Sequence, residues 1–556
     1  MKKSKAGFLL FLCLVSTCVV TVQPVKSQLM GAVYIFNDGT IQSSVNATIP
    51  IQQDGDVYTF TGDLDVSAFV IQRSGVTVDG AGFTLGGGGD AGIYLAVSDV
   101  TIENVQLTGI FFDGVYLAGS HNTITGCTIA NNGNGISLIG STNNNITSNT
   151  IISNDVGLNL VNCSSNLFRN NQLDNAHDIS VYGNELSHFI NDMDDSNTIG
   201  NAKRVYYFVD QENLLITPDT FPDVGYLVLV SCNNVTVYGI TLTRNVQGIL
   251  MAYTSSATIA NCEITDNYVG ALLFASSGNV LGENVITNNY RGIQLSMFSS
   301  LNNIFSNTIE YNSGGIFLFN SSQNTISENN VTNNDNYGIG FSTSSYNLIR
   351  GNYFSNSIQV YDANDDPYSE VTPSINTWFV TASGGGIGNY WSDYTGVDVK
   401  SGLNQDKDGS DGIGDTPYII DANNEDDYPL MPFGSPPVVS IVSPTNKTYT
   451  GTSVGLNFTV SEETSWVGYS LDGLSNVTLS NEETTLSNLP YGLHSITIYA
   501  IDADGNSGDS ETVYFTIAEE TGTSQSEAFP TWILVVITVI AVAVIILSLL
   551  RIMRKK

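Results

Sequence analysis

The chain has 556 residues, of which 53 are acidic and 18 are basic, and its formal net charge is −35 at pH 7. Eight of the basic residues lie near the two ends, so the long middle part is strongly acidic. Such a surface repels nucleic acid and anionic lipid, since both are bound through basic patches. Charged residues make up only 13% of the chain, which is too few for a disordered acidic tail.

The N-terminal segment 1–27 has the layout of a secretory signal peptide. Lysines precede an apolar run from Phe8 to about Val22, and small and polar residues follow around Ser27. Such leaders are removed on export, and this run is too short to span a bilayer stably. A retained N-terminal anchor is the alternative.

The middle of the chain is built from a short repeat. Asparagine-headed units recur about every 21 to 24 residues, with strands such as GISLI and GIFLF between them. The units begin at Asn122, Asn145, Asn166, Asn279, Asn303, Asn324 and Asn347. Self-similarity at this period marks a solenoid, whose coils must stack because one coil cannot bury its own apolar face. The sequence therefore predicts a parallel β-helix over 28–433, with Ile, Val and Leu in its interior columns.

Asparagine suits the corners of such coils. It tolerates the left-handed backbone conformation, and stacked carboxamides can hydrogen-bond from coil to coil as a ladder. We expect one corner asparagine to serve both purposes.

The segment 186–226 breaks the repeat, and we expect an irregular insertion between coils. The densest polar clusters lie nearby, namely Asp174 with His177 and Asp178, and the run from Asp192 to Asp195. Polysaccharide lyases and hydrolases need clustered carboxylates with a basic residue. The arginines of the coils stand alone in the sequence, at Arg73, Arg169, Arg244, Arg291 and Arg350. A solvated face is the alternative to an active site here.

Aromatic residues recur along the predicted coils. They are Tyr206, Tyr207, Phe208, Tyr253, Tyr268, Tyr290, Tyr311, Tyr337, Tyr346 and Tyr353. Exposed rings in a row would stack on sugars, whereas buried rings would only complete the core. The spacing leaves both interpretations open.

The segment 389–431 is expected to cap the solenoid and contains the motif NQDKDGSDGIGD. Counted from its first residue, oxygen donors fall at positions 1, 3, 5, 7 and 12, with glycine at position 6, which is the spacing of a loop that folds around Ca²⁺. The predicted ligands are Asn404, Asp406, Asp408, Ser410 (through its carbonyl) and Asp415. The alternative is a solvated acidic loop without calcium.

The remaining segments predict a second domain and a membrane anchor. Short alternating strands over 437–518 suggest a small Ig-like β-sandwich, followed by a linker at 519–529. Residues 530–550 are apolar and long enough to form a transmembrane helix, and the basic tail 551–556 should stay cytoplasmic. We therefore expect a single-pass type I membrane protein with an extracellular ectodomain.

An exported chain can carry glycans and disulfides. Sequons lie at Asn46, Asn145, Asn162, Asn234, Asn320, Asn330, Asn446, Asn457 and Asn476. The four cysteines beyond the leader, Cys127, Cys163, Cys232 and Cys262, show no tight framework spacing, so we expect buried thiols rather than disulfides.

Three stretches resemble the NosD-like, CASH-type right-handed β-helix proteins of archaeal cell surfaces. They are SNTIGNAKRVYYFVDQENLL, YLVLVSCNNVTV and the set NYWSDYTG, DGIGDTPYIID and DYPLM. The resemblance implies a right-handed solenoid, an extracellular setting and a leaning towards carbohydrate. It also implies copper delivery for one family member, but only four histidines are present and no Met-rich cluster supports it.

From the sequence, the leading function is a cell-surface module that binds a polysaccharide, another glycan or other surface proteins, or that serves structurally. A polysaccharide-active lyase, epimerase or hydrolase is the second hypothesis, and a copper-maturation factor is the third.

Overall fold

The fold is taken from a computed structural model, which describes residues 31–44, 48–109, 112–363, 374–382, 385–409, 411–431, 437–461, 464–479, 483–502 and 507–519. These residues form strands and one short 3-10 helix, η1 (Leu186–Phe189). Within these ranges, no helix is long and apolar enough to cross a membrane. The predicted leader 1–27, membrane segment 530–550 and tail 551–556 lie outside the described residues, so those predictions stay untested. The chain divides into two units, Met1–Met431 and Pro432–Lys556.

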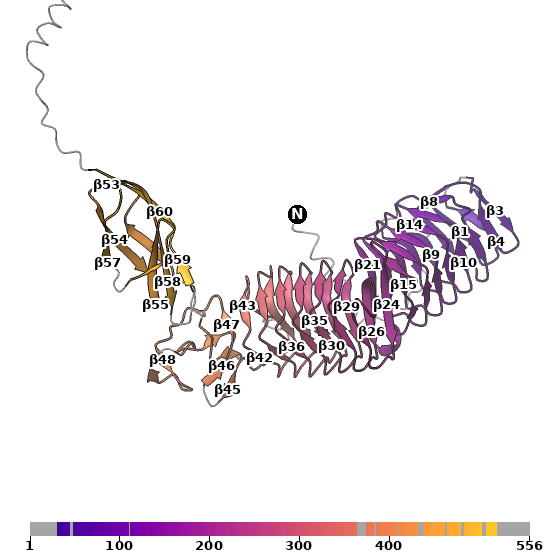
Figure 1. The fold of residues 1–556 in the computed structure, drawn as a ribbon. Coiled ribbons are helices and arrows are strands. Elements are labelled where there is room, and N and C mark those ends of the chain that lie inside the picture. The colour runs from indigo at the N-terminus through magenta and orange to yellow at the C-terminus, as the bar shows by residue number, and fades with distance from the viewer. Residues whose placement is uncertain are drawn as a thin grey trace, which may run out of the picture. The chain divides into compact units, whose positions relative to one another are not determined.

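The first unit is a parallel β-helix, as the repeat predicts, and Figure 1 shows its coils stacked along the chain. In its N-terminal stack, one sheet holds the longer strands β1 (Ala32–Ile35), β6 (Ala68–Ile71), β9 (Ala91–Leu95), β12 (Asp113–Leu117), β15 (Asn134–Ile139), β18 (Val156–Val161) and β21 (His177–Tyr182), with antiparallel β2 (Ile41–Ser43) at its edge. A second sheet holds β3 (Ile51–Asp54), β4 (Val57–Phe60), β7 (Thr77–Asp79), β10 (Thr101–Glu103), β13 (Thr123–Thr125), β16 (Asn145–Thr147), β19 (Leu167–Arg169) and β22 (Asp192–Met193). A third begins with β5 (Leu64–Asp65), β8 (Thr84–Gly86), β11 (Gln106–Thr108), β14 (Thr128–Ala130), β17 (Thr150–Ile152), β20 (Gln172–Asp174) and β23 (Thr198–Ile199).

The C-terminal stack repeats this plan. Its long strands are β24 (Lys203–Val209), β26 (Val224–Val230), β29 (Gln247–Ala252), β32 (Val269–Phe274), β35 (Arg291–Ser296), β38 (Gly314–Phe319), β41 (Tyr337–Ser342) and β44 (Val360–Asp362). One short-strand sheet contains β25 (Leu215–Ile216), β27 (Thr236–Tyr238), β30 (Thr258–Ala260), β33 (Val280–Gly282), β36 (Asn303–Phe305), β39 (Thr325–Ser327) and β42 (Leu348–Arg350). The other contains β28 (Thr241–Thr243), β31 (Glu263–Thr265), β34 (Val285–Thr287), β37 (Thr308–Glu310), β40 (Asn330–Thr332), β43 (Tyr353–Ser355) and β47 (Tyr390–Trp391).

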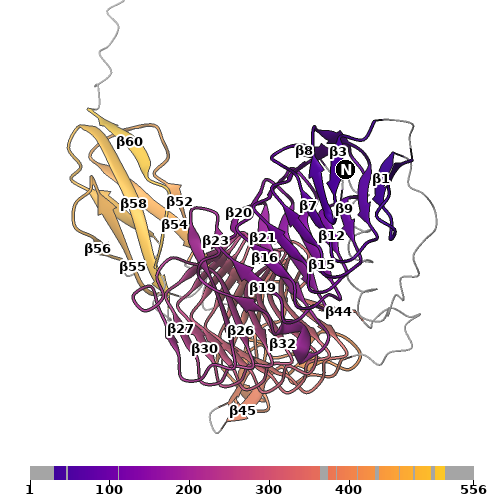
Figure 2. The same cartoon turned by 90° about the vertical axis from the view of Figure 1, so that its right-hand side faces the viewer.

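The two stacks meet at 186–226, where the sequence predicts an irregular insertion. The structure corrects that prediction, because β22 and β23 each extend a sheet of the N-terminal stack. Strand β24 then pairs antiparallel with β23 and parallel with β26. The long strands of the C-terminal stack therefore continue a sheet of short strands from the N-terminal stack, and 186–226 is a joint at which the coil shifts by one strand position (Figure 2).

This joint is closed by apolar packing. The sheet that contains β21 ends here. The edge of β21 forms backbone hydrogen bonds with the corner that precedes β29: the Asp178 N–H donates to the Arg244 carbonyl (2.8 Å), and the Val246 N–H donates to the Ile179 carbonyl (3.0 Å). The outer faces of β26, β29 and β32 are apolar as well, and their side chains join the core of the N-terminal stack.

Aliphatic columns fill both stacks. In the N-terminal stack, Ile102, Ile124 and Ile146 lie in register on successive strands and are fully buried. In the C-terminal stack, Ile293, Ile316 and Ile339 do the same. Burial of such columns supplies the main favourable free energy of the solenoid.

The corners use two consecutive residues where the sequence predicts one. An exposed residue with positive φ, such as Asn143 (φ 57°) or Ser148 (φ 56°), comes first. A buried asparagine follows, such as Asn144, whose backbone N–H and Nδ2 both donate to Oδ1 of Asn166 in the next coil (3.0 Å each). The predicted ladder is therefore present, but the left-handed conformation belongs to the preceding residue.

Two tryptophans, one before and one within the predicted cap 389–431, close the C-terminal end of the solenoid. Trp378 and Trp391 are buried, with ring centroids 5.7 Å apart. Trp391 also stacks on Phe354 of the last coil (4.8 Å). Three hairpins complete this region, formed by β45 (Val380–Ala382) with β46 (Gly385–Ile387), β48 (Lys400–Ser401) with β49 (Lys407–Asp408), and β50 (Tyr418–Ile419) with β51 (Glu425–Asp426).

The second unit contains two sheets that share one apolar core. One sheet contains β52 (Val439–Ser443), β54 (Ser453–Val460) and β57 (Glu483–Ser487), and the other contains β53 (Thr448–Thr450), β55 (Thr464–Leu471), β56 (Val477–Thr478), β58 (Gly492–Asp502), β59 (Ser507–Asp509) and β60 (Val513–Ala518). The unit is thus a β-sandwich, and its assignment as Ig-like stays a prediction.

Candidate functional site

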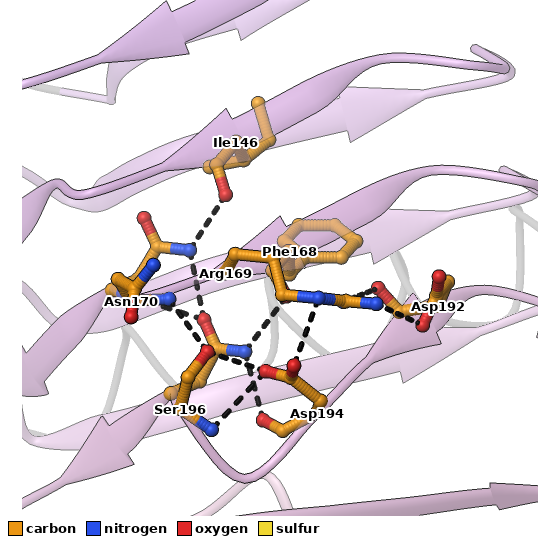
Figure 3. A network of polar contacts seen from close by, with 9 residues as sticks. Ile146, Phe168, Arg169, Asn170, Asp192, Asp194 and Ser196 are labelled. Atoms are coloured by element: carbon orange, nitrogen blue, oxygen red, sulfur yellow. Dashed lines mark hydrogen bonds and ion pairs between the residues drawn. The ribbon is translucent and has the colours of Figure 1, made fainter.

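The acidic run at the joint is held by an arginine from the neighbouring coil. Arg169 Nη2 lies 2.6 Å from Asp192 Oδ1, and Arg169 Nε lies 2.8 Å from Asp194 Oδ2 (Figure 3). The Ser196 N–H also donates to Asp194 Oδ1 (3.1 Å). Arg169 therefore does not stand alone, and these carboxylates fasten one coil to the next.

The other acidic residues near the joint are paired as well. Arg204 Nη1 lies 2.5 Å from Asp195 Oδ2, and Arg244 Nη2 lies 2.7 Å from Asp174 Oδ1. Elsewhere Arg73 pairs with Asp56, and Arg350 Nη1 lies 3.7 Å from Glu328 Oε1. Four of the five arginines expected to stand alone, Arg73, Arg169, Arg244 and Arg350, therefore have carboxylate partners, which lie about one coil away in sequence or across the joint.

Asp178 ends an asparagine ladder. Its Oδ1 accepts the backbone N–H (2.8 Å) and Nδ2 (3.1 Å) of Asn175, which is the last amide of that ladder. Its Oδ2 is buried without a hydrogen-bond partner among the described residues. Burial raises the pKa of Asp178 to about 6 and lowers the pKa of His177. The two acids of the cluster predicted around Asp174, His177 and Asp178 therefore make structural contacts, Asp174 with Arg244 across the joint and Asp178 with Asn175 at the end of the ladder.

A different group of side chains forms the candidate site. It lies on the outer face of the long strands of the C-terminal stack and is called the Arg291 cluster below. Its members are Tyr268, Tyr290, Arg291, Gln294, Phe317, Tyr337 and Tyr361.

Arg291 lies at the centre of this cluster. Its guanidinium carbon is 4.4 Å from the Phe317 ring centroid and 5.9 Å from that of Tyr290, which are cation–π distances. Its Nη1 donates to Gln294 Oε1 (2.8 Å), and Gln294 Nε2 donates to Ser296 Oγ (2.9 Å). The guanidinium also interacts electrostatically with the Tyr337 hydroxyl. The polar groups are thus held in fixed directions between the rings.

The rings are stacked along the coils. Tyr268 and Tyr290 lie 4.6 Å apart at 14°, and Tyr337 and Tyr361 lie 5.6 Å apart at 21°. Phe317 and Tyr337 are tilted, with centroids 6.1 Å apart. Parallel strands in register bring equivalent positions one above another, so aromatic residues in successive repeats meet.

Two glycines make room for these rings. A Cβ at Gly314 would lie 2.4 Å from Tyr337 Cζ, and a Cβ at Gly340 would lie 2.9 Å from Phe317 Cδ2. Gly314 is the residue in register between Arg291 and Tyr337. The Tyr337 ring therefore lies across a strand without a side chain and reaches Arg291.

The cluster adjoins the joint. Tyr182, at the end of β21, interacts electrostatically with Tyr268 and Arg291. The Tyr226 hydroxyl and the Val181 N–H contact Gln247 Oε1, at 3.3 and 3.2 Å. The last strand of the N-terminal stack thus borders the Arg291 cluster.

The other predicted aromatic residues divide between the two interpretations. Tyr206 and Tyr207 are buried, with Tyr207 bonded to the Phe189 carbonyl. Tyr311 and Tyr346 are exposed, and Tyr353 stacks on Tyr390 (4.1 Å).

Two acids of the predicted calcium loop already have partners in the structure. Asp408 pairs with Lys400, and Asp415 Oδ1 accepts the N–H of Lys400 (3.0 Å). Ser410 lies outside the described residues. Among those described, no group of three or more His, Cys, Asp or Glu side chains gathers to hold a metal ion. Calcium binding at Asn404, Asp406, Asp408, Ser410 and Asp415 stays a prediction.

The cysteines and sequons were also placed. Cys127, Cys163, Cys232 and Cys262 are free and buried, as predicted. Five sequon asparagines are exposed, Asn145, Asn234, Asn330, Asn446 and Asn476, and three are partly exposed, Asn162, Asn320 and Asn457. Asn46 lies outside the described residues.

Two family models match the solenoid. Residues 191–396 match the periplasmic copper-binding protein (NosD) model, and residues 67–221 match the right handed beta helix region model. The chain is a NosD-like right-handed parallel β-helix protein. No curated protein matches its sequence.

Solved structures with a similar fold include several enzymes. The periplasmic alginate epimerase AlgG is 11% identical, with 59% of this chain and 72% of that chain covered and a TM-score of 0.22. The A-module of the mannuronan C-5 epimerase AlgE6 from Azotobacter vinelandii is 9% identical (58% and 88% covered, TM-score 0.19). Pectate lyase Pel9A is 12% identical (62% and 88% covered, TM-score 0.18). At these TM-scores the similarity carries no argument about the site.

Copper does not fit the side chains in the part of the chain that the structure describes. Copper is bound by thiolate, thioether or imidazole ligands, yet no suitable group of His or Cys gathers within these ranges. Burial raises the pKa of the Cys127 thiol to about 11 and that of the Cys163 thiol to about 12. The proposed function therefore includes no copper.

Proposed function

We propose that this chain is an exported, membrane-anchored glycan-binding protein whose Arg291 cluster holds sugar rings. The proposal depends on one observation: aromatic rings, a guanidinium and a carboxamide are fixed side by side on one outer face of the solenoid.

The chemistry of the cluster suits a sugar. Aromatic faces accept the apolar face of a pyranose ring, while Arg291 and Gln294 can exchange hydrogen bonds with its hydroxyls. Because stacking and hydrogen bonding fix the side chains in advance, little conformational entropy is lost on binding. The carboxylates of Asp192, Asp194 and Asp195 are each paired with an arginine, which favours binding over catalysis at this acidic run.

The test is titration of the full-length protein in lipid nanodiscs with a panel of neutral and acidic polysaccharides. We expect binding without new reducing ends or unsaturated sugars. Arg291→Ala should weaken it about five- to thirtyfold, since a cation–π contact and its hydrogen bonds are lost.

Two matched variants serve as controls. Arg350→Ala removes a surface ion pair on the short-strand sheet, and Tyr238→Ala removes an exposed ring on β27. Both should leave the affinity unchanged. Equal loss in all three variants, or product formation by the wild type, contradicts the proposal.

A further inference from the structure

A second aromatic pair lies on the outer face of the N-terminal stack. Tyr94 and Tyr116 occupy register positions on β9 and β12, and their rings stack at 5.0 Å with only 4° between their planes. Both side chains are partly exposed. Like the Arg291 cluster, this pair is a flat aromatic surface built by strand register, but it lies in the other stack.

A carboxylate borders this pair. Asp113 Oδ1 accepts Asn134 Nδ2 (2.9 Å) and the Ser137 hydroxyl, whereas its Oδ2 makes no hydrogen bond to the described residues. Asp113 also interacts electrostatically with Tyr116, and burial raises its pKa. Asp113 Oδ1 is thus held by Asn134 and Ser137, and Asp113 Oδ2 can accept hydrogen bonds from a ligand.

Small polar side chains continue the same register towards the joint. Tyr116 is followed by Ser137, Asn159 and Ser180 on β15, β18 and β21. Three strand spacings of ~4.8 Å separate Tyr116 from Ser180, or about 14 Å. Tyr182 on the same last strand interacts with Tyr268 and Arg291. Ser137 and Ser180 are buried and Asn159 is partly exposed, so no bulky side chain at these register positions separates the two aromatic surfaces.

We propose that Tyr94, Tyr116 and Asp113 form a second sugar subsite, and that one long neutral polysaccharide occupies both this subsite and the Arg291 cluster across the joint. The inference rests on the proposed function, since it assigns the ligand of the Arg291 cluster as well. Stacked rings beside a hydrogen-bond-accepting carboxylate recognise a pyranose with adjacent hydroxyls.

Charge selects a neutral chain over an acidic one. The free oxygen of Asp113 repels a uronate carboxylate, and the net charge of −35 repels any polyanion. A single positive group in the Arg291 cluster, already bonded to Gln294, does not reverse this balance.

The experiment compares short and long neutral glucan oligosaccharides with oligogalacturonates of equal length, using the full-length protein in nanodiscs. Tyr116→Ala and Asp113→Ala should weaken binding of the long glucan roughly three- to tenfold, the range expected for one stacked ring. They should not change binding of a glucan too short to leave the Arg291 cluster. Tyr116→Phe keeps the ring and should restore the affinity.

The outcomes separate the two proposals. If Arg291→Ala weakens binding while Tyr116→Ala and Asp113→Ala leave the long glucan unaffected, the second subsite is overturned and the proposed function stands. Tighter binding of oligogalacturonates than of glucans also overturns the inference. If the wild type binds none of these sugars, both proposals fail.

Discussion

Asn307 shows how a buried carboxamide joins one coil to the next. Its backbone N–H and Nδ2 donate to Oδ1 of Asn329 (3.0 and 2.9 Å), and its Nδ2 also donates to the Leu281 carbonyl (2.9 Å). Its own Oδ1 accepts two bonds from Asn284. Every polar atom of the side chain is thereby paired in a buried position, where an unpaired group costs free energy.

Replacing Asn307 by alanine should therefore destabilise the solenoid by about 2–4 kcal/mol, because several buried groups lose their partners at once. Chemical denaturation of the ectodomain measures the change. Asn288→Gly is the control: Asn288 is exposed with φ 56°, a conformation that glycine adopts freely, so its stability should change little. If both variants change the free energy of unfolding equally, the buried asparagine ladder does not stabilise the solenoid as proposed.

Asp178 should make the folding stability depend on pH. Its pKa rises from 3.8 unfolded to about 6 folded through burial, so the folded state holds the proton more tightly. Stability should be highest below about pH 4 and fall as the pH rises to about 6, by on the order of 2–3 kcal/mol. Asp426, whose pKa is also raised to about 6 by burial, contributes in the same direction.

Asp178→Asn should remove the contribution of Asp178 to the loss of folding stability with rising pH. The neutral amide keeps an oxygen for Asn175, so the melting temperature at pH 7.5 should increase and its pH dependence should become shallower. Asp426→Asn is the contrast, because both Asp426 oxygens accept N–H groups, from Trp391 (3.0 Å) and Tyr428 (3.1 Å). That variant should be less stable at every pH. An unchanged pH profile for Asp178→Asn would refute the assignment.

At the level of strands, glycine decides where the aromatic surface can form. Gly314 interrupts the register column between Arg291 and Tyr337, and the ring occupies the space that a side chain would fill. Gly314→Ala should displace Tyr337 and weaken sugar binding about three- to tenfold, while the melting temperature changes little on this outer face. Gly278→Ala, in open space at a corner with φ 69°, is a control for backbone strain. Sugar binding unaffected by Gly314→Ala would argue against a role for Tyr337.

The hairpin of β48 and β49 tests the calcium prediction. Closing the loop on Ca²⁺ requires Asp408 to leave Lys400 and Asp415 to leave the backbone N–H groups that it now accepts. Calorimetry of the ectodomain with CaCl₂ should show binding that Asp406→Asn together with Asp408→Asn abolishes, and MgCl₂ should not replace it. If adding CaCl₂ releases or absorbs no heat of binding, the calcium prediction is wrong.

Periodicity was enough to predict most strands but not the joint. The repeat predicts stacked short strands with Ile, Val and Leu inside, and the structure confirms that arrangement. The joint was missed because 186–226 lacks corner asparagines, although one signal was present. The strand VGYLVLV of β26 is apolar on both faces, unlike GLNLV of β18, and a strand apolar on both faces must be covered on both.

For the whole solenoid, the shift of one strand position at the joint brings two outer faces together. The sheet of β21 ends where the long strands of the C-terminal stack continue a neighbouring sheet, so Tyr182 borders Arg291. Arg291 and Tyr337 are 46 residues apart and Arg291 and Tyr182 are 109 apart. Register brings together the first pair and the joint brings together the second, so neither proximity could be read from local sequence.

An experimental structure of the protein with a long neutral glucan bound is the most direct test of the proposed binding site. We expect sugar rings against Tyr290 and Tyr337, with hydroxyls within hydrogen-bond distance of Arg291 or Gln294. Sugar density only at the isolated exposed rings of Tyr311 or Tyr346, or at the Arg169 network of Figure 3, would contradict it.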